Sequence, residues 1–133
     1  MCGRLWRTGL TAGPETGAFV ANHGTVEPSD VADEQEALAA VAEMGFHGMV
    51  MDMVGAEEDF HFHDFDAVLY VLSGKAAAEY PDGAVLEAAA GTVAKVPTGT
   101  VHRDVPGVTY RGVFGFSVDP AEMTQPINKP VPE

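Results

Sequence analysis

Between residues 46 and 118 the sequence alternates apolar and polar side chains over short runs, and turn-forming residues separate the runs. A period of two is typical of β-strands, because successive side chains of a strand point to opposite faces. The predicted strands are residues 48–54, 67–72, 84–87, 92–96, 101–105 and 108–118. The turns between them contain Pro81-Asp82-Gly83, Gly91, Pro97-Thr98-Gly99 and Pro106-Gly107. Strands that recur about every 8 to 12 residues predict an antiparallel sandwich or barrel.

The segments on either side of this region have different patterns. Residues 29–44 carry apolar side chains at helical spacing, and Asp33-Glu34-Gln35-Glu36 resembles the capping box that begins a helix. Gly45 is placed to end that helix, and residues 18–21 are a further short predicted strand. We therefore expect one domain over residues 1–133, with an N-terminal arm and helix at 1–45, the sheet core at 46–118 and an extended surface tail at 119–133.

Composition excludes several classes of function. The 133 residues are 46% hydrophobic, which is enough to bury a core without disulfides. A formal net charge of −13 excludes general binding to nucleic acid and disfavours binding to anionic membranes. The one cysteine, Cys2, can form neither an internal disulfide nor a cysteine zinc site. With no signal-peptide pattern and no apolar stretch of about 18 residues, we expect a soluble cytoplasmic protein.

Two of the five histidines form a pattern that points to chemistry. His61 and His63 stand two apart on a predicted strand, so both imidazoles project to the same side. Phenylalanines at 60, 62 and 65 surround them, which indicates that the segment is at least partly buried. Buried imidazoles need hydrogen bonds or a metal ion, and neutral imidazole is a common ligand of transition metals. We expect His23 and His47 to be surface or core histidines without such a role.

The context of this pair resembles the cupin superfamily. Residues 61–74, HFHDFDAVLYVLSG, are similar to the first cupin motif, in which two histidines precede a strand that ends in glycine. The second motif corresponds to Gly91, then Pro97-Thr98-Gly99, then His102. Residues 75–90 form the spacer between the two motifs, close to the short spacer of small bacterial cupins. The motifs cover about a third of the chain.

The resemblance implies a small single-domain cupin, a double-stranded antiparallel β-barrel of the jelly-roll type. It implies that His61, His63 and His102 bind a divalent metal ion. The family's glutamate ligand corresponds to Ala67, which cannot bind metal, and its common asparagine corresponds to Pro106. Asp66 is an alternative fourth ligand if a bulge turns it inward. Small cupins commonly pair through sheet edges, so a homodimer is also expected.

Three functions follow as alternatives from a three-histidine cupin site. The first is an Fe(II) dioxygenase acting on a small chelating substrate, similar to thiol dioxygenases and to the β-diketone- and gentisate-cleaving dioxygenases. The second is a Zn, Ni or Mn enzyme of the isomerase, lyase or polyketide-cyclase type, in which the metal polarises an oxygen of the substrate. The third is a non-catalytic module that binds a small ligand.

Substrate-binding residues are harder to select from sequence. Tyr70, Tyr110 and Arg111 are the candidate catalytic side chains. Arg111 would bind a substrate carboxylate or enolate if it points inward, and would only balance the acidic surface if it points outward. Methionines on the strand 48–54 would line one wall of the pocket if their side faces inward. These are Met49, Met51 and Met53.

Overall fold

The computed structural model describes residues 23–132. Their elements are β1 (Thr25–Pro28), α1 (Glu34–Glu43), β2 (His47–Val54), β3 (His61–Phe62), β4 (Ala67–Glu79), β5 (Val85–Ala89), β6 (Thr92–Val96), β7 (Arg103–Asp104), β8 (Thr109–Phe116), the short 3-10 helix η1 (Pro120–Glu122) and β9 (Lys129–Pro130). The predicted all-β class with one α-helix is confirmed over this range. The strand expected at 18–21 and Cys2 lie outside the described residues.

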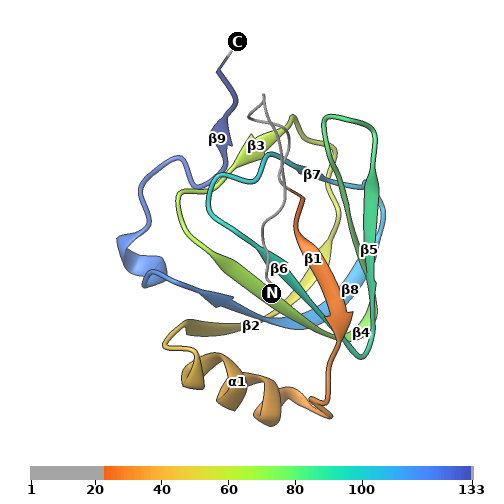
Figure 1. Ribbon diagram of the computed structural model, residues 1–133, viewed down its shortest axis with the longest axis vertical. Coiled ribbons are helices and arrows are strands. Elements are labelled where there is room, and N and C mark those ends of the chain that lie inside the picture. The colour runs from red at the N-terminus through yellow and green to blue at the C-terminus, as the bar shows by residue number, and fades with distance from the viewer. Residues whose placement is uncertain (1–22, 133) are drawn as a thin grey trace, which may run out of the picture.

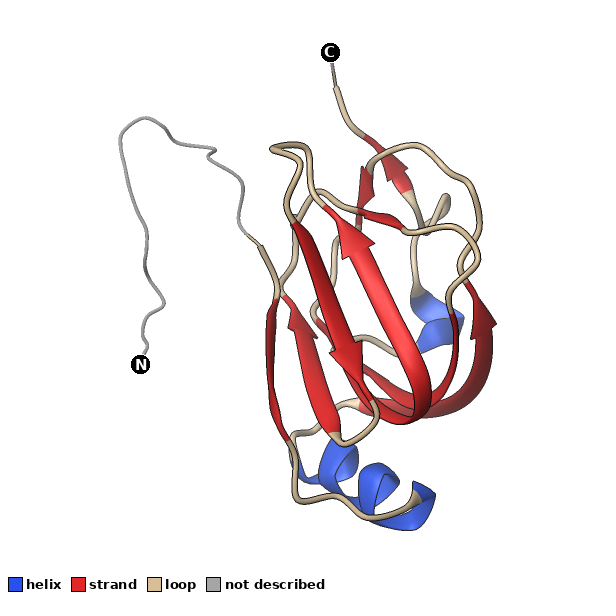
Figure 2. Cartoon of the chain, turned by 90° about the vertical axis from the view of Figure 1, so that its right-hand side faces the viewer, coloured by secondary structure: helices blue, strands red, loops and turns tan. Residues whose placement is uncertain are grey.

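The main sheet is antiparallel, with the strand order β1-β6-β4-β8-β2. The long strand β4 organises it, because its first half pairs with β6 and β8 while its second half pairs with β5 and β7. Gly74, with a φ of +76°, lies where the partners change. In Figure 2 the strands curve around a common interior. The hydrogen bonding ends at β1 and β2 instead of joining them, so the expected closed barrel is corrected to an open sandwich of the same antiparallel type.

Helix α1 ends within one residue of the predicted position but begins five residues later than the predicted start at residue 29. The carboxylate of Asp33 accepts a hydrogen bond from the backbone N–H of Glu36 at 2.9 Å, as a capping box requires. Residues 29–32 precede the helix because the Ser29 hydroxyl accepts a hydrogen bond from the N–H of Val31, which fixes a turn there. Figure 1 shows α1 against one side of the sheet, with β3, β7 and β9 gathered at the opposite end.

Alternate residues of β4 build two separate apolar clusters. Val68 and Tyr70 pack toward α1, together with the fully buried Val41. Leu69 and Val71 point to the other face and pack in the interior of the sandwich. This division follows from the period of two along a strand, and it decides which side chains can reach the interior. Among the described residues no helix has the length and apolar character needed to cross a membrane.

The C-terminal tail differs from the expected extended surface segment. It forms η1 and then β9, which pairs antiparallel with β3, so that Pro130 stands opposite His61. The ammonium group of Lys129 lies 3.8 Å from the carboxylate of Asp64, and the Thr124 hydroxyl donates to the same carboxylate at 2.7 Å. The tail is therefore attached to the segment that carries His61 and His63.

Candidate metal centre

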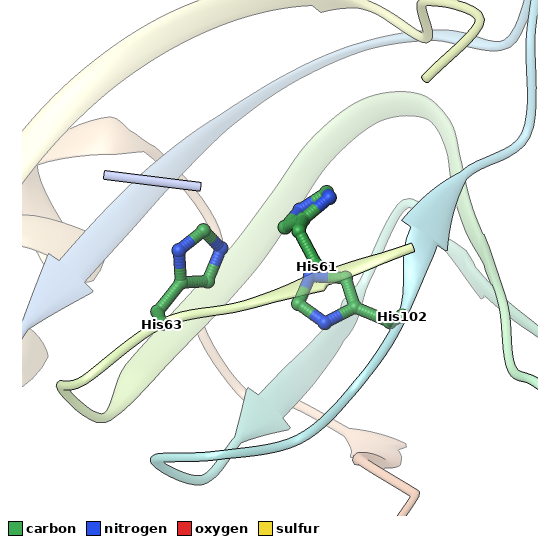
Figure 3. Close-up of side chains that lie close together, drawn as sticks. All are labelled: His61, His63 and His102. Atoms are coloured by element: carbon green, nitrogen blue, oxygen red, sulfur yellow. The ribbon is translucent and has the colours of Figure 1, made fainter. Parts of the chain in front are cut away.

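The side chains of His61, His63 and His102 lie close together, as Figure 3 shows. One ring nitrogen of each lies within 4.8 Å of those of the other two. The ring centroids are 4.7 Å apart for His61 and His102, 5.2 Å for His61 and His63, and 5.3 Å for His63 and His102. The three side chains that the sequence selects as ligands are thus brought together, from segments about 40 residues apart.

Backbone hydrogen bonds fix this arrangement. The N–H of His61 donates to the carbonyl of His102 at 2.9 Å, and the N–H of His102 donates back to His61 at 2.9 Å. The N–H of Gly99, in the turn before His102, donates to the carbonyl of His63 at 2.9 Å. Because these contacts use main-chain atoms, the three imidazoles remain free to face one another.

Asp66 has a different role from the alternative considered above. Its carboxylate accepts hydrogen bonds from the N–H and the hydroxyl of Thr98, at 2.8 and 2.9 Å. It therefore holds the Pro97-Thr98-Gly99 turn that leads into His102. The alternative that Asp66 supplies a fourth metal ligand is wrong, because this side chain points outward to the turn.

Each imidazole has one nitrogen fixed by a backbone carbonyl. The Nδ1 of His61 lies 3.0 Å from the carbonyl oxygen of Asp59, that of His63 lies 3.0 Å from Ile127, and that of His102 lies 2.8 Å from Thr100. A carbonyl oxygen only accepts hydrogen bonds, so each Nδ1 carries the proton and each Nε2 keeps a lone pair. Carbonyls that hold the second nitrogen are the usual outer partners of metal-binding histidines.

The protonation of the rings also suits a metal ligand set. Burial lowers the pKa of His63, against an opposing hydrogen bond to Ile127, and the nearby His61 lowers it further. Burial likewise lowers the pKa of His102, where His61 and His63 add to the effect. Both rings are therefore neutral at pH 7, the form that binds metal. Phe65, which is buried, stacks on the ring of His63 with centroids 5.0 Å apart.

Two carboxyl groups stand beside the histidines. Glu58 accepts a hydrogen bond from the N–H of Asp104 at 2.9 Å and lies 3.9 Å from Nδ1 of His61. Burial raises the pKa of Asp104, and the charge of Glu58 raises it further. Sequence analysis missed Glu58, which stands in an irregular segment without periodicity. The sequence offers only its position three residues before His61 as a signal.

A cavity of about 110 Å³ adjoins His102. Its walls include Asp104, Tyr110 and Phe114, and the other side chains around it are mostly small. Ala67 is one of them, so the position that corresponds to the family's glutamate borders open space instead. Of the three histidines, His102 is the one that lines this cavity, so a small molecule bound there would lie beside it.

Of the three candidate catalytic side chains, the structure brings only Tyr110 to this cavity. Tyr70 does not reach the cavity, because it packs in the cluster beneath α1 on the other face of β4. The inward alternative for Arg111 is also wrong: its guanidinium is partly exposed and donates to Asp52 at 2.7 Å and to Glu34 at 2.9 Å. Tyr110 and Arg111 are neighbours on β8 and therefore point to opposite faces.

The remaining sequence candidates lie away from the cavity. Met49, Met51 and Met53 pair with Phe114, Gly112 and Tyr110 respectively, and so share their inward face. They are partly exposed at the β2 edge and are not among the cavity-lining residues. His23 stacks on Tyr80 and pairs with Asp82, and His47 is exposed on β2. Neither belongs to the histidine cluster, as expected.

The carbonyl of Ile127 leads to a prediction about the tail. Deleting residues 124–133 removes the partner of His63 Nδ1 and the strand β9, so we expect zinc affinity to fall about 10- to 100-fold. Isothermal titration of zinc into the purified protein measures the change. Deleting only residues 131–133 leaves β9 in place and is expected to have no effect. Equal affinities for the two truncated proteins would contradict the role of the tail.

Comparisons with known proteins give similarity to solved structures. A protein from Neisseria meningitidis is 26% identical over 54% of this chain and 73% of its own, with a TM-score of 0.47. A DUF861 family protein from Thermotoga maritima is 16% identical over 73% of this chain and 100% of its own, with a TM-score of 0.47. The polyketide cyclase RemF from Streptomyces resistomycificus is 24% identical over 65% of this chain and 62% of its own, with a TM-score of 0.46.

No family model and no curated protein matches the chain. Two features of the structure agree with what the resemblance in the sequence implies. The first feature is the antiparallel sandwich around β4. The second is the clustering of His61 and His63 with His102. Over its described residues, this chain is an antiparallel β-sandwich with a three-histidine cluster that could hold a metal ion, as the resemblance to cupins implies.

Proposed function

We propose that this protein is a metal-dependent enzyme in which His61, His63 and His102 bind one divalent ion beside a small substrate cavity. One observation carries the proposal: all three Nδ1 atoms are held by backbone carbonyls, which leaves three Nε2 lone pairs for a common ligand. Three neutral ligands fit a catalytic metal better than a structural one, because they leave coordination positions open. The cavity at His102 provides the space that those positions need.

The activity that we propose is that of an Fe(II) dioxygenase acting on a small organic substrate. When bound, the ion supplies open coordination positions and redox chemistry with dioxygen. The chain supplies the rest: the histidines hold the ion, and the cavity orients the substrate next to it and limits access of water. Burial raises the pKa of Tyr110 to about 12, so its hydroxyl stays protonated and can donate a hydrogen bond to a substrate oxygen.

A second candidate uses the same histidines with zinc, nickel or manganese as a Lewis acid. Three histidines with an open position are also a catalytic zinc site. The observation that favours this candidate is the carboxyl of Asp104, which lines the cavity together with His102. Isomerases, lyases and cyclases need such a group beside the metal to accept or donate a proton.

Two measurements test the candidates. The first is metal analysis of protein purified without air, and the second is oxygen uptake with small phenols, enols and thiols. The dioxygenase predicts about one iron per chain and substrate-dependent oxygen uptake that His63→Ala abolishes and His47→Ala retains. Tight zinc or nickel with no oxygen uptake would favour the Lewis acid. Protein without metal, and with no affinity for added Fe(II) or zinc, would overturn both in favour of a binding module.

A further inference from the structure

The wall of the cavity beside the histidines is apolar and made by small residues. Ala76 and Ala88 are buried in the interior cluster with Leu69, and Ala94 packs against them. The cavity is open where these alanines have no larger side chain, and the aromatic rings of Tyr110 and Phe114 form another part of its wall. At about 110 Å³ the cavity is somewhat smaller than the engineered cavity of about 150 Å³ that takes up benzene. It therefore has the size of a single ring.

The charges around the cavity are unfavourable to an anion. Apart from His102, whose ring is neutral, Lys95 is the one basic side chain among the described residues that line it, and this side chain is half-exposed and 3.7 Å from Glu27. Asp104 lies in the wall, and the carboxylate of Glu58 accepts a hydrogen bond from the backbone N–H of Asp104. In the metal-free protein, a carboxylate placed among the alanines would lose its hydration without gaining a cationic partner.

The two arginines in the described part of the chain do not alter this balance. Arg103 donates to Glu79 at 2.9 Å and lies over the ring of Phe60, 4.2 Å from its centroid. Arg111 is paired on the outer face, as described above. Neither guanidinium lines the cavity, so recognition there depends on shape, apolar contact and hydrogen bonds.

We propose that the cavity selects an uncharged, single-ring-sized planar molecule that carries a hydroxyl or enol group, and that it rejects carboxylates. As a statement about substrate, the inference rests on the proposed function, because the hydroxyl oxygen would be the atom that faces the metal-binding histidines. As a statement about binding, it depends on the cavity wall alone. The inference narrows the small chelating substrate expected from the sequence to an uncharged one.

A pair of fluorinated probes of similar shape tests the proposal. We expect 4-fluorophenol, followed by fluorine NMR, to bind both the metal-free and the zinc-loaded protein. We expect 4-fluorobenzoate to bind the metal-free protein at least about tenfold more weakly. Equal binding of the two probes to the metal-free protein, or no binding of 4-fluorophenol, would overturn the inference.

Matched variants on β5 locate the binding. Ala88→Leu fills the cavity and is expected to abolish 4-fluorophenol binding while zinc still binds, whereas Ala89→Leu, whose side chain is exposed, should change neither. Circular dichroism checks folding, and Ala94→Leu on β6 serves if Ala88→Leu does not fold. Unchanged binding in the folded filled variant would overturn the inference. If the wild-type protein binds 4-fluorophenol but does not bind zinc, the metal site is contradicted instead.

Discussion

Replacing His102 by alanine is expected to lower the affinity for zinc or Fe(II) by at least about 100-fold. The substitution removes one of three ligands, and loss of an outer partner alone commonly costs 10- to 100-fold. The fold should survive, because the contacts between His102 and His61 that hold the strands together are made by backbone atoms. Metal content after dialysis and isothermal titration measure the effect, and we expect the same for His61→Ala and His63→Ala.

His47→Ala is the matched control for these substitutions. His47 is exposed on β2 and stands outside the cluster, so its replacement should leave metal stoichiometry and affinity unchanged. Saturating metal stabilises the folded form by mass action, by about 2.7 kcal/mol at 100 times the dissociation constant. The gain in melting temperature on adding zinc should therefore appear in wild type and His47→Ala and vanish in His102→Ala. A full equivalent of tightly bound metal in His102→Ala would refute the ligand assignment.

Replacing Gly74 by alanine is expected to destabilise the protein by more than about 3 kcal/mol. Gly74 has a φ of +76°, which by itself costs a residue with a Cβ about 1 to 2 kcal/mol. In addition, a Cβ at this position would lie 2.3 Å from the carbonyl oxygen of Thr109 and 2.8 Å from Cα of Tyr110. Both are backbone atoms, so the clash can be relieved only by moving β4 away from β8. Urea unfolding at 25 °C measures the loss.

Gly91→Ala separates the two contributions. Gly91 has a φ of +89°, but a Cβ there would meet nothing within 4 Å. We therefore expect this variant to lose only the conformational part, about 1 to 2 kcal/mol. Equal losses for the two variants would show that the close approach of β8 to Gly74 does not matter.

The features that sequence predicted are those set by local pattern. The period of two located the strands, and the Asp33 and Glu36 pair marked the capping box of α1, although the predicted helix began too early, at residue 29. The three histidines were selected by the resemblance to the two cupin motifs. The strands and the cap depend on side-chain alternation, capping and turn chemistry, which act within a few residues. The single-domain assignment and the homodimer stay predictions.

The features that sequence did not predict depend on contacts between distant segments. Ile127 holds His63 from 64 positions away and through a backbone carbonyl, which leaves no trace in residue type. The opposite orientations of Tyr110 and Arg111 follow from strand parity, but parity alone does not say which face is the interior. The packing of α1 against Tyr70 and its neighbours decides that question.

Anomalous X-ray diffraction from crystals of the zinc-loaded protein tests the central claim most directly. The account predicts one strong peak with the Nε2 atoms of His61, His63 and His102 each at about 2.0 to 2.1 Å, and with each Nδ1 still on its backbone carbonyl. Zinc held elsewhere on the chain, with these three rings binding no ion, would contradict it.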